Sequence, residues 1–273
     1  STSPHKLLDA VRGATKELES NTTNAEATTP TSLQSFDSDG FTVGTNGAVN
    51  ENTQTYASWN WLANGTGVSN TDGNVNTTIS VNTTSGFSII SANTGSTTGE
   101  LTLGHGLNAI PSMFIWKNRD DAGQNWQVYH KSTGTGLMRL NDSGVVNTAV
   151  TFWNTPTTTL FKMTDNMYSQ NKNFIGYCFA DVQGFSKFGS YVGNGSTDGP
   201  FIYTGFKPAF LIVKNIDAAE AWGMHDNKRP GLGNGNAPVG HFELQPNLSN
   251  VENSAGAAGQ IDFLSNGFKL RTA

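Results

Sequence analysis

The stretch "PSMFIWKNRDDAGQNWQVYH", residues 111–130, is nearly repeated as "PAFLIVKNIDAAEAWGMHD", residues 208–226. In both copies a Pro precedes four apolar residues, then Lys-Asn, a polar turn, and a Trp that opens a second short run. Four apolar residues between chain breakers are too few for a helix and favour a strand covered on both faces. The copies therefore predict equivalent hairpins with first strands at 113–117 and 210–214. Trp126 and Val128 should share one strand face, because side chains alternate along a strand.

The similarity extends to the N-terminal part of the chain. Asp9-x-x-Arg12-Gly13 matches Asp226-x-x-Arg229-Pro230-Gly231, "SFDSDGFTVG" (35–44) matches "DFLSNGFKLR" (262–271), and "TYASWNWLA" (55–63) matches "NFIGYCFAD" (173–181). Residues 5–20 also carry a helix-like apolar spacing, but the repeat favours two strands around a turn. In 173–181, alternate residues should face two different layers.

These matches predict an all-β chain of tandem antiparallel β-sandwich repeats of about 100–120 residues, within the usual size of a domain. We expect the later strands of a first unit at 1–63, a complete unit at 64–184, and a third unit at 185–273 that lacks its last strand. An open sheet edge invites pairing. The missing strand would come from residues beyond Ala273, or from the closing segment 55–63 of another copy.

The composition agrees with a β-rich, turn-rich molecule. Only 14% of residues are charged and Gly reaches 31, so hydroxyl and amide groups must solubilise the surface. The formal charge is −5, and Lys and Arg are scattered, which argues against a nucleic-acid partner. No apolar stretch approaches the length of a membrane span, so no membrane insertion is expected. The lone Cys178, between aromatic residues, is predicted to be a packed, inert thiol.

Several of these segments resemble a known group of proteins. "HKLLDAVRGATKELESN", "SFDSDGFTVG", "GHGLNAIPSMFIWKNRDDAGQNWQVYH" and the region from "GYCFADV" to "LIVKN" are similar to tandem β-sandwich domains in virion structural proteins of marine tailed phages. The resemblance implies jelly-roll folds of the concanavalin-A/laminin-G type. It implies a non-enzymatic tail-fibre, head-fibre or capsid-decoration protein on the virion surface. Such a protein would assemble with copies of itself or other virion proteins and contact host-surface glycans.

An alternative interpretation is a secreted carbohydrate-binding or adhesin protein of a bacterium. It rests on the same fold and on the aromatic residues alone, and a fold by itself does not assign a function.

Candidate catalytic groups are few. A glycosidase needs two carboxylates about 5–10 Å apart across a sugar ring. Asp120 and Asp121 lie in a predicted turn, and Glu17 and Glu19 lie on a predicted strand without a third carboxylate. We therefore expect no enzyme activity.

Two candidate binding sites remain. Asp37-x-Asp39-Gly40 offers loop oxygens of the kind that Ca²⁺ takes in concanavalin-like sandwiches. The same residues suit an ordinary β-turn, and the matching "FLSNGF" lacks both carboxylates, so we favour the turn. For a glycan we single out Trp126, Tyr129 and Asp121 around one loop, because sugar sites combine aromatic surfaces with polar groups. No other cofactor is expected.

Overall fold

The computed structural model describes residues 3–164, 167–229, 242–252 and 261–271. The protein is nearly all-β, with 35% strand and 2% helix, and neighbouring strands in its sheets are antiparallel. The predicted all-β, sandwich-like class is confirmed. Residues 5–20 form two strands around a turn, as the repeat predicts, and not a helix.

The largest element is a seven-stranded sheet in the middle of the chain, with the order β12-β11-β10-β15-β8-β7-β6. Its strands, in chain order, are β6 (Val68–Asn70), β7 (Thr77–Asn82), β8 (Phe87–Asn93), β10 (Met113–Asn118), β11 (Gln127–His130), β12 (Met138–Arg139) and β15 (Asn173–Phe179). A short 3₁₀ turn, η1 (Lys131–Thr133), follows β11.

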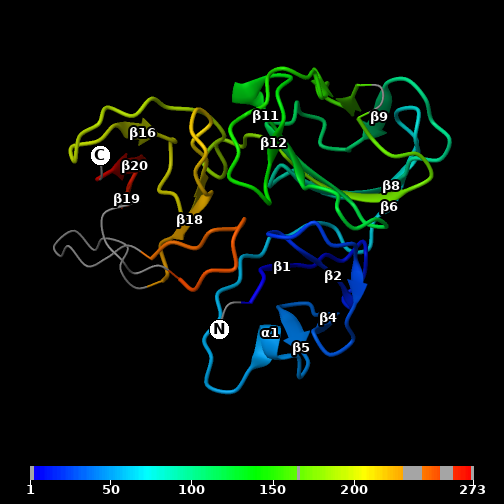
Figure 1. Ribbon diagram of the computed structural model, residues 1–273, viewed down its shortest axis with the longest axis horizontal. Coiled ribbons are helices and arrows are strands. Elements are labelled where there is room, and N and C mark those ends of the chain that lie inside the picture. The colour runs from blue at the N-terminus through cyan, green and yellow to red at the C-terminus, as the bar shows by residue number, and fades with distance from the viewer. Residues whose placement is uncertain (1–2, 165–166, 230–241, 253–260, 272–273) are drawn as a thin grey trace.

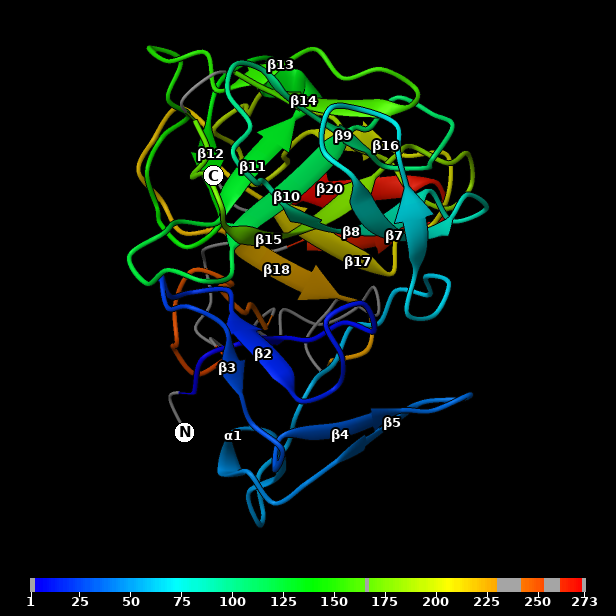
Figure 2. The ribbon, with the colours of Figure 1, turned by 90° about the vertical axis from the view of Figure 1, so that its right-hand side faces the viewer.

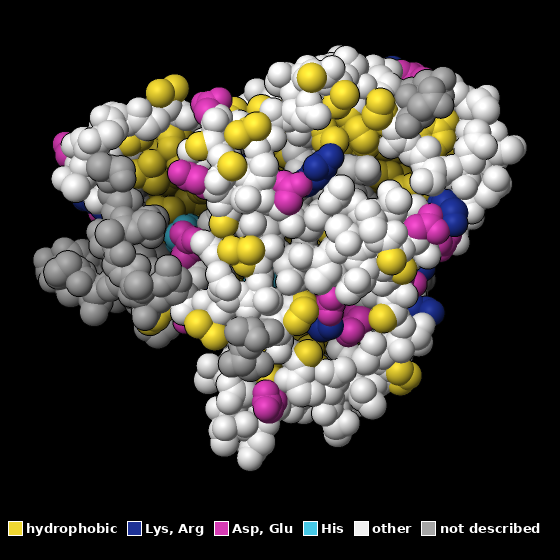
Figure 3. Space-filling view, viewed as in Figure 1, with side chains coloured by type: hydrophobic (Ala, Val, Ile, Leu, Met, Phe, Trp, Pro, Cys, Tyr) yellow, Lys and Arg dark blue, Asp and Glu magenta, His cyan; other side chains and the backbone are white. Residues whose placement is uncertain are grey.

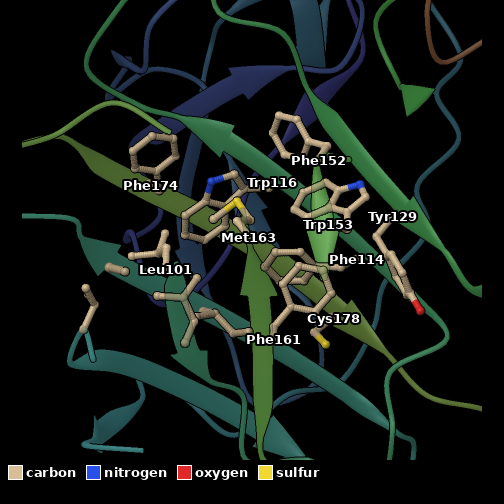
Figure 4. Close-up of a cluster of buried hydrophobic side chains, with 14 of the residues drawn as sticks. Leu101, Phe114, Trp116, Tyr129, Phe152, Trp153, Phe161, Met163, Phe174 and Cys178 are labelled. Carbon is tan, nitrogen blue, oxygen red and sulfur yellow. The ribbon is translucent and has the colours of Figure 1, made fainter. Parts of the chain in front are cut away.

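A second sheet lies over one face of this sheet (Figure 2). It has the order β13-β14-β9 and consists of β9 (Leu101–Gly104), β13 (Trp153–Asn154) and β14 (Leu160–Met163). Buried side chains from both sheets fill the space between them, among them Leu101, Phe114, Trp153 and Phe161 (Figure 4). The middle of the chain is therefore a two-layer β-sandwich.

The remaining elements form smaller sheets. N-terminal elements are β1 (Lys6–Leu7), β2 (Lys16–Glu19), β3 (Ala27–Thr28), the hairpin β4 (Leu33–Phe36) and β5 (Phe41–Val43), and helix α1 (Gly47–Asn50). C-terminal elements are β16 (Phe201–Tyr203), β17 (Phe210–Val213), β18 (Gly223–Asp226), β19 (Ile261–Leu264) and β20 (Gly267–Leu270). The sheets β19-β20-β16 and β13-β14-β9 have the same connectivity. In each, the central strand follows one neighbour directly in the chain, and its other neighbour comes from earlier in the chain, which supports an internal repeat.

The doubled sequence forms equivalent hairpins. In β10–β11 Met113 pairs with His130, and in β17–β18 Phe210 pairs with Asp226. The two hairpins differ on their outer side. β10 also pairs with β15, whereas within the described residues β17 pairs with β18 alone.

The Asp-x-x-Arg turn also recurs in three dimensions. Asp9 accepts hydrogen bonds from the backbone N–H of Val11 and Arg12. The Arg12 side chain donates from Nε to the Asp9 carboxylate and from Nη2 to the carbonyl of Leu7. Asp226 and Arg229 make the same set, with Nη2 on the carbonyl of Met224. Pro230 and Gly231 lie outside the described residues.

The closing segment 55–63 differs from its prediction, since the structure assigns no strand to it. It nevertheless behaves like its counterpart β15. The hydroxyl of Tyr177 donates to Asp9 at 2.8 Å, and Nε1 of Trp59, the matching residue, donates to Asp226 at 3.1 Å. The segment thus meets the third unit of its own chain through side chains.

The three units are linked in a cycle around a second apolar cluster, on the other face of the seven-stranded sheet. Nε1 of Trp126 donates to the carbonyl of Glu19 in the first unit, and Nε1 of Trp222 donates to the carbonyl of Arg139 in the second. His5 occupies the matching place in the first unit, and its imidazole interacts with the backbone of Gln245 in the third, although Nε2 has no partner of normal hydrogen-bond geometry. The chain therefore forms three lobes around one centre (Figure 1).

Candidate functional site

A pocket of about 230 Å³ opens at the turn end of the β10–β11 hairpin. Four side-chain amides line it, from Asn118, Gln124, Asn125 and Gln127. Aromatic rings of Phe152, Tyr168 and Phe174 form the apolar part of its wall. Among the described residues that line the pocket, none has a charged side chain.

Strand pairing explains why these residues meet. Trp116 and Asn118 lie two apart on β10 and so share one face of the sheet. Gln127 is directly opposite Trp116 on β11, and Phe174 is directly opposite Asn118 on β15. Opposite residues of an antiparallel pair project to the same side. The second sheet, β13-β14-β9, packs on this face of the large sheet. The pocket forms beyond the edge of that second sheet.

The four amides differ in how many of their donors and acceptors already make hydrogen bonds. Asn118 is largely used: Oδ1 accepts from the backbone N–H of Asp120 and Asp121, and Nδ2 donates one hydrogen bond to the Asp121 carboxylate. Asn125 accepts from Asn141 through Oδ1. The structure gives the side-chain amides of Gln124 and Gln127 no hydrogen-bond partner among the residues it describes. Both therefore have donors and acceptors available.

Trp116 is not itself a lining residue but adjoins two of them, Gln127 and Phe174; its indole is completely buried and its Nε1 has no hydrogen-bond partner. The ring stacks on Phe174 with 4.8 Å between centroids and lies against Gly176, where a Cβ would come within 2.8 Å of it. Figure 4 shows its nitrogen directed between Phe174 and Phe152, the two rings that also line the pocket. A buried N–H without a partner costs about 1–3 kcal/mol.

Asp121, which the sequence singles out, lies at the margin of this site. It pairs with Lys172 at 2.6 Å and accepts from Asn118. These hydrogen bonds, first from Lys172 and then from Asn118, lower the pKa of the Asp121 carboxyl. Its neighbour Asp120 accepts from the backbone and side chain of Asn173, so both carboxylates hold the turn against the start of β15.

Trp126 and Tyr129 do not join Asp121 in one site. They project from opposite faces of β11, Trp126 into the central cluster and Tyr129 into the sandwich core. Trp126 is 0% exposed and its Nε1 is used on Glu19, so it offers no surface to a ligand. Tyr129 packs edge-on against Trp153 and Phe161. Both rings are core residues, because alternation along β11 places each in a filled layer. Trp126 shares its face with Val128, as predicted.

The two aspartates considered for calcium lie in the β4–β5 turn. The Asp37 oxygens accept from the hydroxyls of Ser35 and Thr42, each at 2.8 Å, and its backbone N–H donates to Gly40. This arrangement is the turn favoured from the sequence. Within the described residues no three His, Cys, Asp or Glu side chains are grouped as metal ligands.

The pair Glu17 and Glu19 is held by one cation. Nζ of Lys6 lies 3.0 Å from Glu17 and 2.6 Å from Glu19. Burial lowers the pKa of Lys6, but the hydrogen bonds that it donates to Glu19 and Glu17 outweigh this effect and raise the pKa. The carboxylates thus join β1 to β2.

Other buried titratable groups are packed in the core. Cys178 is fully buried and burial raises the pKa of its thiol well above the usual value, which agrees with the predicted packed thiol. Lys117 is enclosed with Nζ 2.8 Å from the carbonyl of Gln124, and burial lowers its pKa to about 8. Its ammonium fixes the turn that carries Gln124.

The surface is mainly uncharged. Figure 3 shows a limited number of acidic and basic side chains, several of them side by side, among many atoms of other side chains and the backbone, with separate apolar areas on that face. In the part of the chain that the structure describes, no helix is long and apolar enough to cross a membrane.

Sequence reasoning missed the residues that line the pocket. Asn125 and Gln127 are the direct neighbours of Trp126, so their side chains point away from it, and Gln124 lies in the turn before them. Trp116 is predicted only as part of a buried strand. The available signal was the alternation itself, which places Trp116 and Gln127 on the same side once the hairpin register is known.

The fold and this pocket define an all-β protein of interlocked antiparallel repeats with a small amide-lined site. Residues 1–273 match the family described as Domain of unknown function (DUF7483), and the chain belongs to that family. No curated protein matches the chain. No solved structure matches it either.

Proposed function

We propose that the protein is a non-enzymatic structural component of a phage particle: a tail-fibre, head-fibre or decoration protein that contacts host-surface glycans. The observation that carries this proposal is the cyclic linkage of the three units. Buried indole N–H groups of Trp126 and Trp222 connect successive units, and a shared apolar cluster lies between them. Such a body suits a rigid, load-carrying part of an assembly.

Open strand edges support assembly with further copies or other virion proteins. β16 pairs only with β20 among the described strands, and its Phe201 and Tyr203 are exposed, Tyr203 by 67%. An edge of this kind exposes unpaired N–H and C=O groups that another chain can pair with. The resemblance of the repeats to virion β-sandwiches supplies the context.

The alternative is a secreted bacterial carbohydrate-binding or adhesin protein on the same scaffold. The amide-lined pocket favours it as much as it favours glycan contact by a virion. Localisation separates the two readings.

The decisive experiment labels purified particles with antibodies raised against this chain and locates the label by electron microscopy. We expect label at regular positions on the particle, with particles from a strain lacking the gene as the control. Protein that is found only free in the culture medium would contradict the proposal and favour the alternative. Polysaccharide turnover that disappears on replacing one carboxylate pair would contradict its non-enzymatic part.

A further inference from the structure

We infer that the pocket beside the β10–β11 hairpin binds one neutral sugar ring, with Trp116 Nε1, Gln124 and Gln127 as its polar contacts. The inference deepens the glycan-contact part of the proposed function and rests on that part, and it assigns the contact to a site.

The first argument is the chemistry of the wall. Side-chain amides both donate and accept, as sugar hydroxyls do, and those of Gln124 and Gln127 have no partner within the described structure. Amides and aromatic rings are combined in one small cavity, and the described part of its lining has no charged side chain. Asp121, which accepts a hydrogen bond from the lining residue Asn118, is paired with Lys172 at 2.6 Å, so the two charges compensate each other. A charged saccharide would be desolvated there without a counter-charge, so the site selects a neutral one.

The second argument is the buried Trp116 N–H. It is enclosed and without a partner, although most buried indole N–H groups find one. An indole donates only, so the missing partner is an acceptor oxygen. A ring or hydroxyl oxygen of a sugar that enters between Phe152 and Phe174 would supply it.

The third argument is size. Pockets for drug-sized ligands usually measure roughly 300–1,000 Å³. At about 230 Å³ this pocket is smaller and suits a single pyranose.

The repeat provides an internal comparison. In the equivalent hairpin β17–β18 the residue in place of Trp116 is Val213, and Gly223 stands in place of Gln127. That hairpin has neither the buried N–H nor the opposing amide. The site therefore belongs to the second unit, and the third unit supplies a matched control position, Glu220, in place of Gln124.

The test uses the full chain labelled with ¹⁵N, in which each of the six Trp side chains gives one indole N–H resonance. The Trp116 signal is assigned from the Trp116→Phe variant. The neutral probes are the methyl glycosides of glucose, galactose, mannose and N-acetylglucosamine. Glucuronic acid and N-acetylneuraminic acid are the charged probes, and N-methylacetamide represents a peptide group.

We expect at least one neutral glycoside to shift the Trp116 resonance in a saturable way. Gln127→Ala should weaken that binding at least tenfold, which is about 1.4 kcal/mol. Glu220→Ala, at the matched turn position, should leave the dissociation constant within twofold. If Trp116→Phe does not fold, the Trp116 signal is assigned by through-bond NMR experiments on the wild-type chain, so the test does not depend on that variant.

Three outcomes would overturn the inference. They are an unshifted Trp116 resonance with all four glycosides, an equal or stronger response to a charged sugar or to N-methylacetamide, and unchanged affinity in Gln127→Ala. Particle labelling is independent of these results. A glycoside that binds a protein absent from particles would keep the site and refute the virion assignment.

Discussion

At the scale of single residues, the molecule relies on a few buried polar groups with complementary partners. The Asp9–Arg12 pair is the clearest, because its side chains are almost wholly enclosed and Tyr177 both donates to Asp9 and accepts from Arg12. Burial is the main cause that raises the pKa of Tyr177, so its hydroxyl remains protonated as a donor. Buried ion pairs are costly to break, because the remaining charge is left without compensation.

Replacing Tyr177 with Phe tests that network. The variant removes one donor and one acceptor next to buried charges, and bonds to charged groups contribute about 1.5–3 kcal/mol each. We expect the free energy of unfolding to fall by about 2 kcal/mol in urea titrations. Tyr203→Phe, on an exposed ring, is the matched control and should change it little. Equal stability of the two variants would mean that the hydroxyl is dispensable.

His105 predicts a pH effect. Its Nδ1 accepts from the N–H of Leu107, and Nε2 lies 3.2 Å from the carbonyl of Thr157, so the ring is neutral with the proton on Nε2. Burial is the main cause that lowers its pKa below 6.5. The unfolded chain therefore binds a proton at a higher pH than the folded one. The His105 contribution to stability is complete above pH 6.5 and is lost as the pH falls below it.

The measurement is the free energy of unfolding between pH 7.5 and 5 for wild type and His105→Gln. One buried histidine contributes at most about 1.4 kcal/mol per pH unit to the slope. Gln keeps a donor and an acceptor without titrating, so the variant should lose less stability over this range. Lys207→Gln, at an exposed site, should keep the wild-type slope. A slope in His105→Gln as steep as in wild type would assign the acid sensitivity to other groups.

At the scale of elements, β15 separates the two apolar layers. Phe174 and Cys178 face the sandwich core, while Ile175 and Tyr177 face the central cluster, as the alternation predicts. Gly176 lies between them on the sandwich side. Its missing side chain lets Phe114 and Trp116 lie flat on the sheet.

Gly176→Ala should therefore destabilise the strand. A Cβ there would meet the Phe114 ring at 2.6 Å and Trp116 at 2.8 Å, and overpacking of this kind costs about 1–3 kcal/mol. Gly189→Ala is the matched control, since its Cβ would meet nothing within 4 Å. Thermal unfolding measures both. A Gly176→Ala variant as stable as Gly189→Ala would show that the rings can shift without cost.

At the scale of the whole molecule, the second unit depends on the other two. One face of its large sheet packs on its own second layer, and the other contributes Met113, Ile115 and Val128 to a cluster that Leu18 and Trp222 complete from outside. The units are separate in sequence but share this core. The boundaries predicted from the sequence at 63/64 and 184/185 do not by themselves imply independent folding.

We predict that the isolated fragment 64–184 exposes this face. It should bind the dye ANS and associate in solution, because a contiguous exposed apolar face promotes association. The full chain should unfold in one transition, with circular dichroism and tryptophan fluorescence coinciding. A monomeric 64–184 that unfolds cooperatively without ANS binding would show that the shared cluster is not needed for folding.

The sequence alone determined the strands, the hairpin repeat, the alternation in β15 and the Asp-x-x-Arg turn, because each depends on residues close together in the chain. Hydrophobic period and turn chemistry are local properties, and they were sufficient for the fold class. Only the tertiary structure decided which part of the molecule covers each face of β11. It placed Trp126 and Tyr129 in two cores, joined Trp59 to Asp226, and paired Gln127 with Trp116 across the hairpin. Those contacts depend on strand register and on the packing of segments up to 167 residues apart, which local patterns do not specify.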